Sequence, residues 1–407
     1  MRFKKIFLGA LAFAGAFLFA VSAYADRDQG VDLAGDYQGQ TAVFGQASDK
    51  FAIIQIGGYY NGSFHTQKYY QSQVASTIAQ GKRAHTYIFS EFSTRAQADQ
   101  MLDYYLPKIQ TPKNSIVALD VEAGTPSTDA VIYALNRIKQ AGYTPVLYGY
   151  LSFLKAHLDL STIADSYPLW LAEYPDYQVR TTPDYNYFPS YKNIHVFQFT
   201  STYKAGGLDG DVDLLGITQN GYGSNGKSSQ GGTAVKPDSK TPAINNGQAA
   251  NNTPKSDIAA GYTVKVNFGA SRWANGALIP SWVKGQSYKV QQVSGNKVLL
   301  AGILSWISKS DVEILQTSQQ ANSVSSNLPA GVHAQNGYFH PNQCLMVWTS
   351  AGYGPTGVHY YPGESIHYSG YIRNGAYIYV VYQSASGHWR YVADRRAATS
   401  YPLGWFE

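Results

Sequence analysis

The sequence of 407 residues contains one cysteine, Cys344. An internal disulfide is therefore excluded, and the chain is not a small secreted scaffold held together by disulfide bonds. Cys344 lies in the strand-like segment QCLMVW. There we expect a small buried apolar side chain rather than a nucleophile.

The chain also lacks a glycine-rich phosphate-binding loop, which argues against an open nucleotide-binding sheet. After residue 25, no apolar run is long enough to cross a membrane. The first 25 residues carry three basic residues, then an apolar stretch, then the small-residue pattern Ala23-Tyr24-Ala25. This order predicts a signal peptide at 1–25 that is cleaved after Ala25, with a retained membrane anchor as the alternative. We expect the mature protein to be exported.

Charge is scarce, at 14% of residues, and unevenly distributed. Residues 26–221 hold 14 Lys and Arg against 19 Asp and Glu, a net charge of −5; residues 222–407 hold 14 against 7, a net of +7. The basic second half is either attracted to an anionic partner or simply kept soluble by its charge.

Two polar stretches divide the chain. After Tyr222, residues 223–259 contain no aromatic residue and are rich in Gly, Ser, Asn, Pro and Lys, which predicts a flexible linker at 222–259. A second short linker is predicted at 316–329. The expected units are a large domain at 26–221 and two small modules at 260–315 and 330–407.

The large domain alternates apolar runs with amphipathic helical patterns, which is typical of parallel βα units. Helical patterns fill the gaps through the fifth run, whereas the gaps before the last two are rich in Pro, Tyr and Gly. We therefore predict an α/β fold, a partly helix-wrapped eight-stranded (β/α) barrel of the TIM type, (β/α)5β3, with an open doubly wound sheet as the alternative. The eight expected strands are 31–34, 51–57, 84–90, 115–122, 144–150, 168–174, 193–201 and 212–215.

Carboxylates cluster at predicted strand ends. Asp120 and Glu122 are two residues apart, so they project from the same face at the carboxyl end of the fourth strand, where barrel enzymes hold their chemistry. Asp32 lies in the first strand and Asp213 in the eighth, and these strands become neighbours when the barrel closes. Crowded carboxylates raise one another's proton affinity, as glycoside hydrolysis requires. Metal binding and a purely structural role are the alternatives.

The segments GVDLAGDYQG, FAIIQIGG, LDVE, PLWLAEY, FQFTS and GDVDLLG, in this order, resemble the glycoside hydrolase family 25 lysozymes over about residues 29–221. The resemblance implies hydrolysis of the β-1,4 bond between N-acetylmuramic acid and N-acetylglucosamine in peptidoglycan. It implies Glu122 as general acid, Asp120 as the group that orients the substrate acetamide, and Asp32 and Asp213 as supporting carboxylates. It also implies a retaining, acetamido-assisted route rather than direct attack by an aspartate.

Three positions depart from the family pattern. An extra residue follows Asp32, Ile88 replaces the usual histidine, and Phe197 stands where tryptophan is common. Chitinase-like barrels share the Asp-x-Glu ending, but their fuller motif needs acids at 115 and 118, where this chain has serine and alanine. Side chains expected to bind substrate, with core packing as the alternative for each aromatic one, are Tyr87, Tyr148, Trp170, Tyr174 and Gln198.

The two small modules read as short strands with tight glycine turns, which predicts SH3-like all-β folds. Residues 330–407 resemble bacterial SH3b wall-binding domains in YFHPN, PGESIHYSGYI and WRYVA. Peptidoglycan glycan strands are the expected partner of the barrel, with stem peptides or teichoic acids as further partners of the modules.

The sequence thus predicts a secreted muramidase associated with the cell wall, without cofactor, nucleic-acid partner or stable membrane insertion. The competing hypothesis is an inactive wall-binding protein that uses the barrel as a glycan-binding scaffold.

Overall fold

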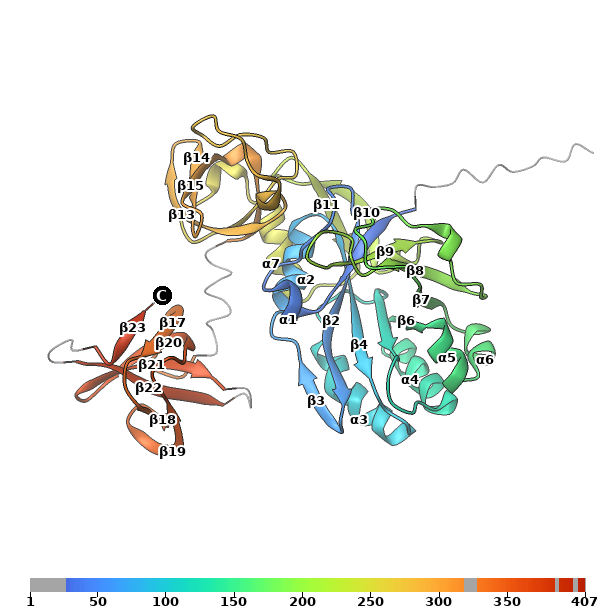
Figure 1. Ribbon diagram of the computed structural model, residues 1–407, viewed down its shortest axis with the longest axis horizontal. Helices are drawn as coiled ribbons and strands as arrows, with labels where there is room; N and C mark the ends of the chain where they lie inside the picture. Colours follow the sequence, from blue (N-terminus) through green and yellow to red (C-terminus); the bar gives the residue numbers. More distant parts are fainter. Residues whose placement is uncertain (1–26, 318–327, 385–387, 398–401, 407) are drawn as a thin grey trace, which may run out of the picture.

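The computed structural model describes residues 27–317, 328–384, 388–397 and 402–406 (Figure 1). The predicted signal peptide and most of the predicted linker at 316–329 lie outside the described residues. No helix among the described residues has the length and apolar character needed to cross a membrane.

The first part of the chain closes into an eight-stranded barrel, which confirms the predicted fold class. The sheet order is β1-β9-β8-β7-β6-β5-β4-β2-β3, and parallel pairing of β1 with β2 closes the ring. β3 (Ser63–Thr66) forms a hairpin with β2 outside the ring. The barrel strands are β1 (Gln29–Leu33), β2 (Phe51–Tyr60), β4 (Arg83–Ser90), β5 (Ile116–Asp120), β6 (Thr144–Tyr150), β7 (Leu169–Ala172), β8 (Ile194–Thr200) and β9 (Asp209–Asp213).

Helices cover part of the outside of the barrel, as expected (Figure 1). Two of the longest begin at good capping residues: the Thr94 side chain accepts from the Gln97 N–H in a reciprocal capping box, and Ser127 accepts from the Ala130 N–H. The helices are α1 (Gly35–Gln38), α2 (Tyr70–Ala79), α3 (Arg95–Tyr105), α4 (Thr128–Gln140), α5 (Leu151–His157) and α6 (Leu160–Ala164).

The period of two along each strand separates an inner from an outer core. On β5, Val117 and Leu119 face the helices, whereas Ile116 and Ala118 pack inside the barrel. Asp120 continues the inner face and is 5% exposed. The same apolar strand that builds the core therefore delivers a carboxylate to the inside of the barrel at its carboxyl end.

The last barrel strand differs from the prediction. β9 begins at Asp209 rather than at residue 212, and it runs antiparallel to both β8 and β1. The reason is the short glycine-rich connection between Thr200 and Asp209, which can form a hairpin-like return but is too short for a parallel crossover. The amino end of β9, not its carboxyl end, therefore lies at the carboxyl ends of the parallel strands.

The predicted flexible linker at 222–259 is instead a folded segment in the structure. It forms the hairpin β10 (Tyr222–Lys227) and β11 (Thr233–Pro237) and the helix α7 (Pro242–Asn251), which packs on α2. Gly247 explains the close approach, because a Cβ there would lie 2.4 Å from the Ala75 carbonyl oxygen and 2.6 Å from the Ile78 Cβ. Ile244 is completely buried in the barrel's outer core, which contributes about 1.5–3 kcal/mol.

The first small module is all-β, as predicted, and its five strands have the order β15-β14-β13-β12-β16. Its core includes Ala79 of α2 and Ala250 of α7, so it is continuous with the helices of the barrel. The strands are β12 (Thr263–Val266), β13 (Ser287–Ser294), β14 (Lys297–Leu300), β15 (Ser305–Ser308) and β16 (Val312–Gln316).

The C-terminal module is a seven-stranded all-β unit with the order β19-β18-β22-β21-β20-β17-β23. Cys344 lies in the turn before β18 and is exposed, not buried as expected, because it precedes the strand rather than standing within it. The strands are β17 (His333–Pro341), β18 (Leu345–Ser350), β19 (Tyr353–Tyr360), β20 (Ile366–Asn374), β21 (Tyr377–Gln383), β22 (Trp389–Arg396) and β23 (Gly404–Phe406).

Candidate active site

A small acidic cavity of about 90 Å³ opens at the carboxyl ends of the parallel strands. Seven of the side chains predicted from the sequence line it, together with one that was not predicted, Asp209. The lining residues are Asp32, Tyr87, Asp120, Glu122, Tyr148, Trp170, Gln198 and Asp209. Seven different strands carry these side chains, and Glu122 lies just beyond the end of β5, so the barrel geometry alone brings them together.

Asp120 and Glu122 enter the cavity from β5 and the residues that follow it. The Val121 N–H donates to the Tyr148 carbonyl oxygen at 3.0 Å, which extends the strand pairing past Asp120 and keeps both carboxylates on the inner face. Burial, and then the negative charge of Glu122, raise the pKa of Asp120 well above its usual value. Burial and the charge of Asp209 raise the pKa of Glu122 as well.

Asp120 has an oxygen with no protein partner. Among the described residues, its Oδ1 is buried and accepts no hydrogen bond. An unsatisfied buried carboxyl oxygen costs about 1–3 kcal/mol or more. Such an atom in a cavity wall is suited to receive an N–H or O–H group of a ligand.

Asp32 is held at the centre of a buried hydrogen-bond network. The Gln198 Nε2 donates to Asp32 Oδ2 at 2.7 Å, and the Tyr148 hydroxyl donates to Gln198 Oε1 at 2.9 Å. Burial, followed by the charges of Asp209 and Asp211, raises the pKa of Asp32 well above its usual value. Gln198 therefore fixes a carboxyl group whose neighbours favour its protonated form.

Two further carboxylates of β9 belong to this network, and the sequence interpretation missed both. Asp209 pairs with Asp32 across the antiparallel β1–β9 ladder, and burial raises its pKa to about 6. Asp211 lies deeper in the barrel, where it accepts a 2.8 Å hydrogen bond from the Trp170 indole N–H. The signal that could have found them is the period-two series Asp209, Asp211 and Asp213 in LDGDVDLL, which puts all three on the inner face.

Asp213, expected to be a supporting carboxylate, does not line this cavity. It lies at the opposite end of β9, where its carboxylate accepts from the backbone N–H groups of Leu215, Gly216, Ile217 and Thr218 at 2.7–3.2 Å and from the Thr218 hydroxyl at 2.6 Å. These bonds hold the 3-10 turn η3 (Ile217–Gln219). The reason is that β9 runs antiparallel to its neighbours, so its carboxyl end lies at the amino ends of the parallel strands.

The aromatic side chains form two groups, one in the buried wall of the cavity and one at its rim. Tyr148 and Trp170 pack at a ring-centroid distance of 4.3 Å, and Tyr87 lies edge-on to Trp170 at 6.2 Å, so these three form the buried wall of the cavity. Tyr174 does not line the cavity. It lies at the rim, where its hydroxyl is 2.7 Å from that of Tyr150. Tyr177 follows at 78% exposure and extends this aromatic rim into solvent.

Comparison with known proteins gives a family for this barrel. The model of "Glycosyl hydrolases family 25" matches residues 37–208, a span that holds Asp120 and Glu122 and ends just before Asp209. A D-alanyl-L-alanine endopeptidase of Streptococcus phage B30 is 37% identical over 137 residues, which are 32% of this chain and 31% of that protein. A lysozyme of Lactococcus phage mv1 is 27% identical over 179 residues, which are 40% of this chain and 86% of that protein.

The chain spans about a third to a half of the length of the other curated relatives, which are the lysozymes of Streptococcus phages Cp-9 and Cp-7. Among solved structures, the Cpl-1 endolysin with a peptidoglycan analogue is similar over 92% of this chain and 97% of that one, at 16% identity and a TM-score of 0.38. With its closed barrel, its strand-end carboxylates and the match over residues 37–208, this chain carries a domain of glycosyl hydrolases family 25.

Proposed function

We propose that the barrel is a muramidase that hydrolyses the β-1,4 bond between N-acetylmuramic acid and N-acetylglucosamine in peptidoglycan. The observation that carries the proposal is the placement of Asp120 and Glu122 together in an acidic cavity with Asp32 and Asp209. The family match over this segment supports a glycoside substrate.

In this proposal Glu122 is the general acid. Its pKa is raised by burial and by the charge of Asp209, so a larger fraction carries a proton near neutral pH and can be given to the oxygen that leaves. Glu122 is also partly exposed, which leaves it accessible to a sugar at the mouth of the cavity.

Asp120 would orient the 2-acetamido group through its unpartnered Oδ1, which can accept the amide N–H. The acetamido oxygen then attacks the anomeric carbon as the glycosidic bond breaks, and the proton of Glu122 goes to the leaving sugar oxygen. Water opens the resulting oxazolinium ion and returns a proton to Glu122, with net retention of configuration. This route needs no second carboxylate at the anomeric carbon and is an exception to the usual two-carboxylate scheme.

Asp209, whose pKa of about 6 leaves it largely ionised at neutral pH, would stabilise the positive charge that develops on the sugar ring, and Asp32 would support it from the neighbouring strand. They face the same cavity and are fixed by Gln198 and by strand pairing, so little reorganisation accompanies the reaction. Tyr87, Tyr148 and Trp170 would contact the sugar faces, and the Tyr150–Tyr174 rim would contact the next sugar along the strand.

The two β modules would hold the enzyme at the wall, and the protein would be secreted through the signal at 1–25. The C-terminal module exposes aromatic side chains that suit contact with sugar or stem peptide, namely Tyr338, Tyr353, Tyr361 and Trp405. The net charge of +7 over residues 222–407 would add attraction to anionic wall polymers such as teichoic acids.

The test uses the mature protein on purified cell walls, with identification of the new reducing ends. Muramic acid ends support the proposal, whereas glucosamine ends, or none, contradict it. Glu122→Gln should lower turnover by about 10²- to 10⁴-fold and leave wall binding intact. Glu173→Gln, at an exposed glutamate just beyond the next-but-one strand, is the matched control and should keep wild-type turnover.

A further inference from the structure

A second and larger cavity, of about 490 Å³, lies between the barrel and the first small module. It opens at the amino ends of the parallel strands, because Asp28, Lys50 and Lys82 directly precede β1, β2 and β4. The hairpin β10–β11 contributes Asn225, and the module contributes Lys265, Asn267 and Glu313. The cavity is thus at the opposite end of the barrel from Glu122, and no residue of the acidic cavity lines it.

Three buried cations line this junction cavity. Lys82, Arg83 and Lys265 are 7%, 3% and 6% exposed. Cations are rarely buried to this degree without partners, because desolvation of a charge costs several kcal/mol. The carboxylates and hydrogen-bond acceptors around each cation therefore determine how well its charge is compensated.

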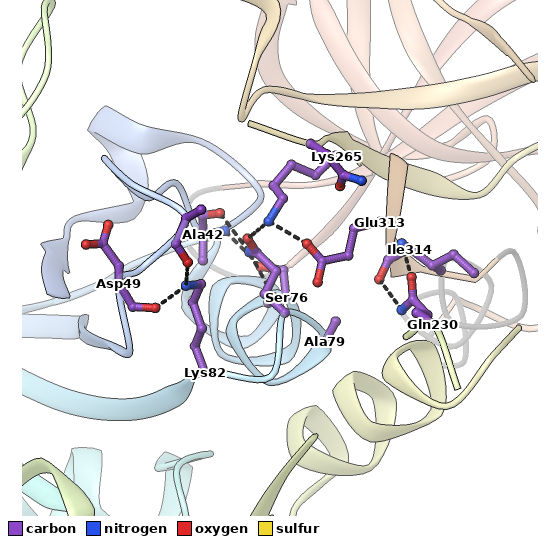
Figure 2. A network of polar contacts seen from close by, with 12 residues as sticks. Ala42, Asp49, Ser76, Ala79, Lys82, Gln230, Lys265, Glu313 and Ile314 are labelled. Atoms are coloured by element: carbon purple, nitrogen blue, oxygen red, sulfur yellow. Dashed lines mark hydrogen bonds and ion pairs between the residues drawn. The ribbon is translucent and has the colours of Figure 1, made fainter. Parts of the chain in front are cut away.

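Two of these cations have carboxylate partners. Arg83 is 2.5 Å from Asp28 and also donates to the Thr218 hydroxyl at 3.0 Å, while its Nε has no partner among the described residues. Lys265 lies 2.5 Å from Glu313 (Figure 2). It also donates to Gln80 Oε1 at 2.6 Å.

Lys82 is the poorly compensated cation. It donates to the carbonyl oxygens of Ala47 and Asp49, and no carboxylate within ion-pair distance of it is seen in the described part of the chain. The Asp49 carboxylate is committed to the N–H groups of Gly45 and Gln46 and to the Tyr203 hydroxyl. Burial, and then the charge of Lys265, lower the pKa of Lys82 to about 8.

The cavity walls therefore carry a surplus of positive charge. Lys50, Lys82, Arg83 and Lys265 line it against three carboxylates, Asp28, Asp49 and Glu313, which leaves one positive charge in excess. The amides of Asn225 and Asn267 add neutral donors. Asp49 and Glu313 offset the repulsion between Lys82 and Lys265 only in part, and a bound anion would offset it further.

The two sides of the cavity are held in a fixed relation. Gln230 donates to the Ile314 carbonyl oxygen and accepts from the Ile314 N–H at 3.1 and 2.6 Å, as Figure 2 shows. Asn251 donates to the carbonyl oxygens of Ala79 and Thr233, and the Thr41 and Ser287 hydroxyls are 2.6 Å apart. These bonds join barrel, folded segment and module, so the cavity exists before any ligand binds.

We propose that this junction cavity binds a phosphate group, either free or as the phosphodiester of an anionic polymer. Lysine and arginine approach from both sides, and a tetrahedral phosphate offers several oxygens to such divergent donors, whereas a planar carboxylate matches a single guanidinium best. The volume exceeds that of phosphate alone and leaves room for an attached polyol or sugar.

The experiment titrates the mature protein with inorganic phosphate, with glycerol 3-phosphate and with a short glycerol-phosphate polymer, by calorimetry at pH 7 and constant ionic strength. Acetate and chloride are the anion controls. Saturable phosphate binding that acetate does not reproduce supports the proposal. Binding of the polymer that is tighter than binding of both inorganic phosphate and glycerol 3-phosphate, a monoester, identifies the phosphodiester as the source. Absence of saturable phosphate binding, or equal binding of acetate, overturns it.

Variants locate the binding. Lys82→Met should weaken phosphate binding at least tenfold, and Lys50→Gln, at an exposed position that folding does not require, should weaken it about two- to fivefold. Lys227→Gln, an exposed lysine of β10 outside the cavity, should leave it unchanged. Unchanged binding in Lys50→Gln and Lys82→Met would refute the site, and if Lys82→Met fails to fold, Lys50→Gln decides alone. Glu122→Gln should bind phosphate as wild type, which separates this proposal from that of the muramidase.

Discussion

Replacement of Asp213 by alanine tests whether the direction of β9 separates structural from catalytic carboxylates. Asp213 accepts hydrogen bonds from four backbone N–H groups and from the Thr218 hydroxyl, and it is 3% exposed. In Asp213→Ala these donors lose their acceptor, although some regain water as the turn η3 opens. We expect stability, not catalysis, to be lost.

The magnitude follows from the bonds that are removed. Hydrogen bonds to a charged group contribute about 1.5–3 kcal/mol each, but they are not additive when one turn carries all of them. A net loss of about 3–5 kcal/mol is therefore expected, in the range for a broken buried network. At about 2–4 °C per kcal/mol for a domain of this size class, the Tm should fall by roughly 6–20 °C.

The assay pairs thermal unfolding with muramidase turnover per folded protein at a temperature well below both transitions. Asp213→Ala should keep turnover within about threefold of the wild type. Asp209→Asn, the matched variant at the other end of the same strand, should melt at or above the wild-type Tm, because the neutral amide avoids the cost of ionising a buried carboxyl, and should lose at least about 10²-fold in turnover. The reasoning is refuted if Asp213→Ala melts like the wild type but loses hydrolysis.

Two other predictions concern the acid cluster and the folded segment. Because burial raises the pKa of Asp209 to about 6, the folded state binds its proton more tightly than the unfolded chain, so this group's contribution to stability is lost as pH rises from about 4 to 6. Asp209→Asn should flatten that part of the pH profile of urea unfolding, and an unchanged profile would contradict the assignment. Gly247→Ala should separate α7 from α2, since its Cβ would lie 2.4 Å from a carbonyl oxygen, and should lower stability by about 1–3 kcal/mol. Gly232→Ala, in the open turn of the hairpin, is the control and should be neutral.

The position of Asp120 and Glu122 could be predicted from the sequence because one strand determines it. Ile116, Ala118 and Asp120 alternate with Val117 and Leu119, and the structure keeps that alternation inside and outside the barrel. Period two is a local property, and the carboxyl end of a parallel strand is the known place for chemistry in barrels. No contact with another segment was needed to place these two side chains on one face.

The role of Asp213 could not be predicted in the same way, because it depends on strand direction. The spacing of Asp209, Asp211 and Asp213 puts all three inside the barrel whichever way β9 runs. Only the length of the preceding connection decides which end reaches the mouth, and the eight residues between β8 and β9 favour an antiparallel return.

The composition of residues 222–259 led to the prediction of a flexible linker, although this segment is folded. Gly, Ser, Asn and Pro usually mark flexible chains. In α7, however, the small residues Ala243, Gly247 and Ala250 are buried because they let the helix approach α2 closely. Asn251 is buried as well, with its amide satisfied by two backbone carbonyls from other segments. Composition alone cannot distinguish a segment whose small residues allow close helix packing from a segment that stays unfolded. The difference depends on the surface that the segment packs against, which lies far away in the sequence.

The barrel places its acidic cavity and its cationic junction cavity at opposite ends, and this has a kinetic consequence. β4 has Arg83 in the junction cavity and Tyr87 in the acidic cavity, and the four residue steps between them at about 3.3 Å each span roughly 13 Å. The Debye length at physiological ionic strength is about 8 Å, so a phosphate in one cavity exerts little force on a sugar in the other. Saturating phosphate should therefore leave KM and kcat for a soluble glycan within about twofold of their values in chloride at equal ionic strength. Competitive inhibition by phosphate would instead place the anion among the strand-end carboxylates and contradict the junction site.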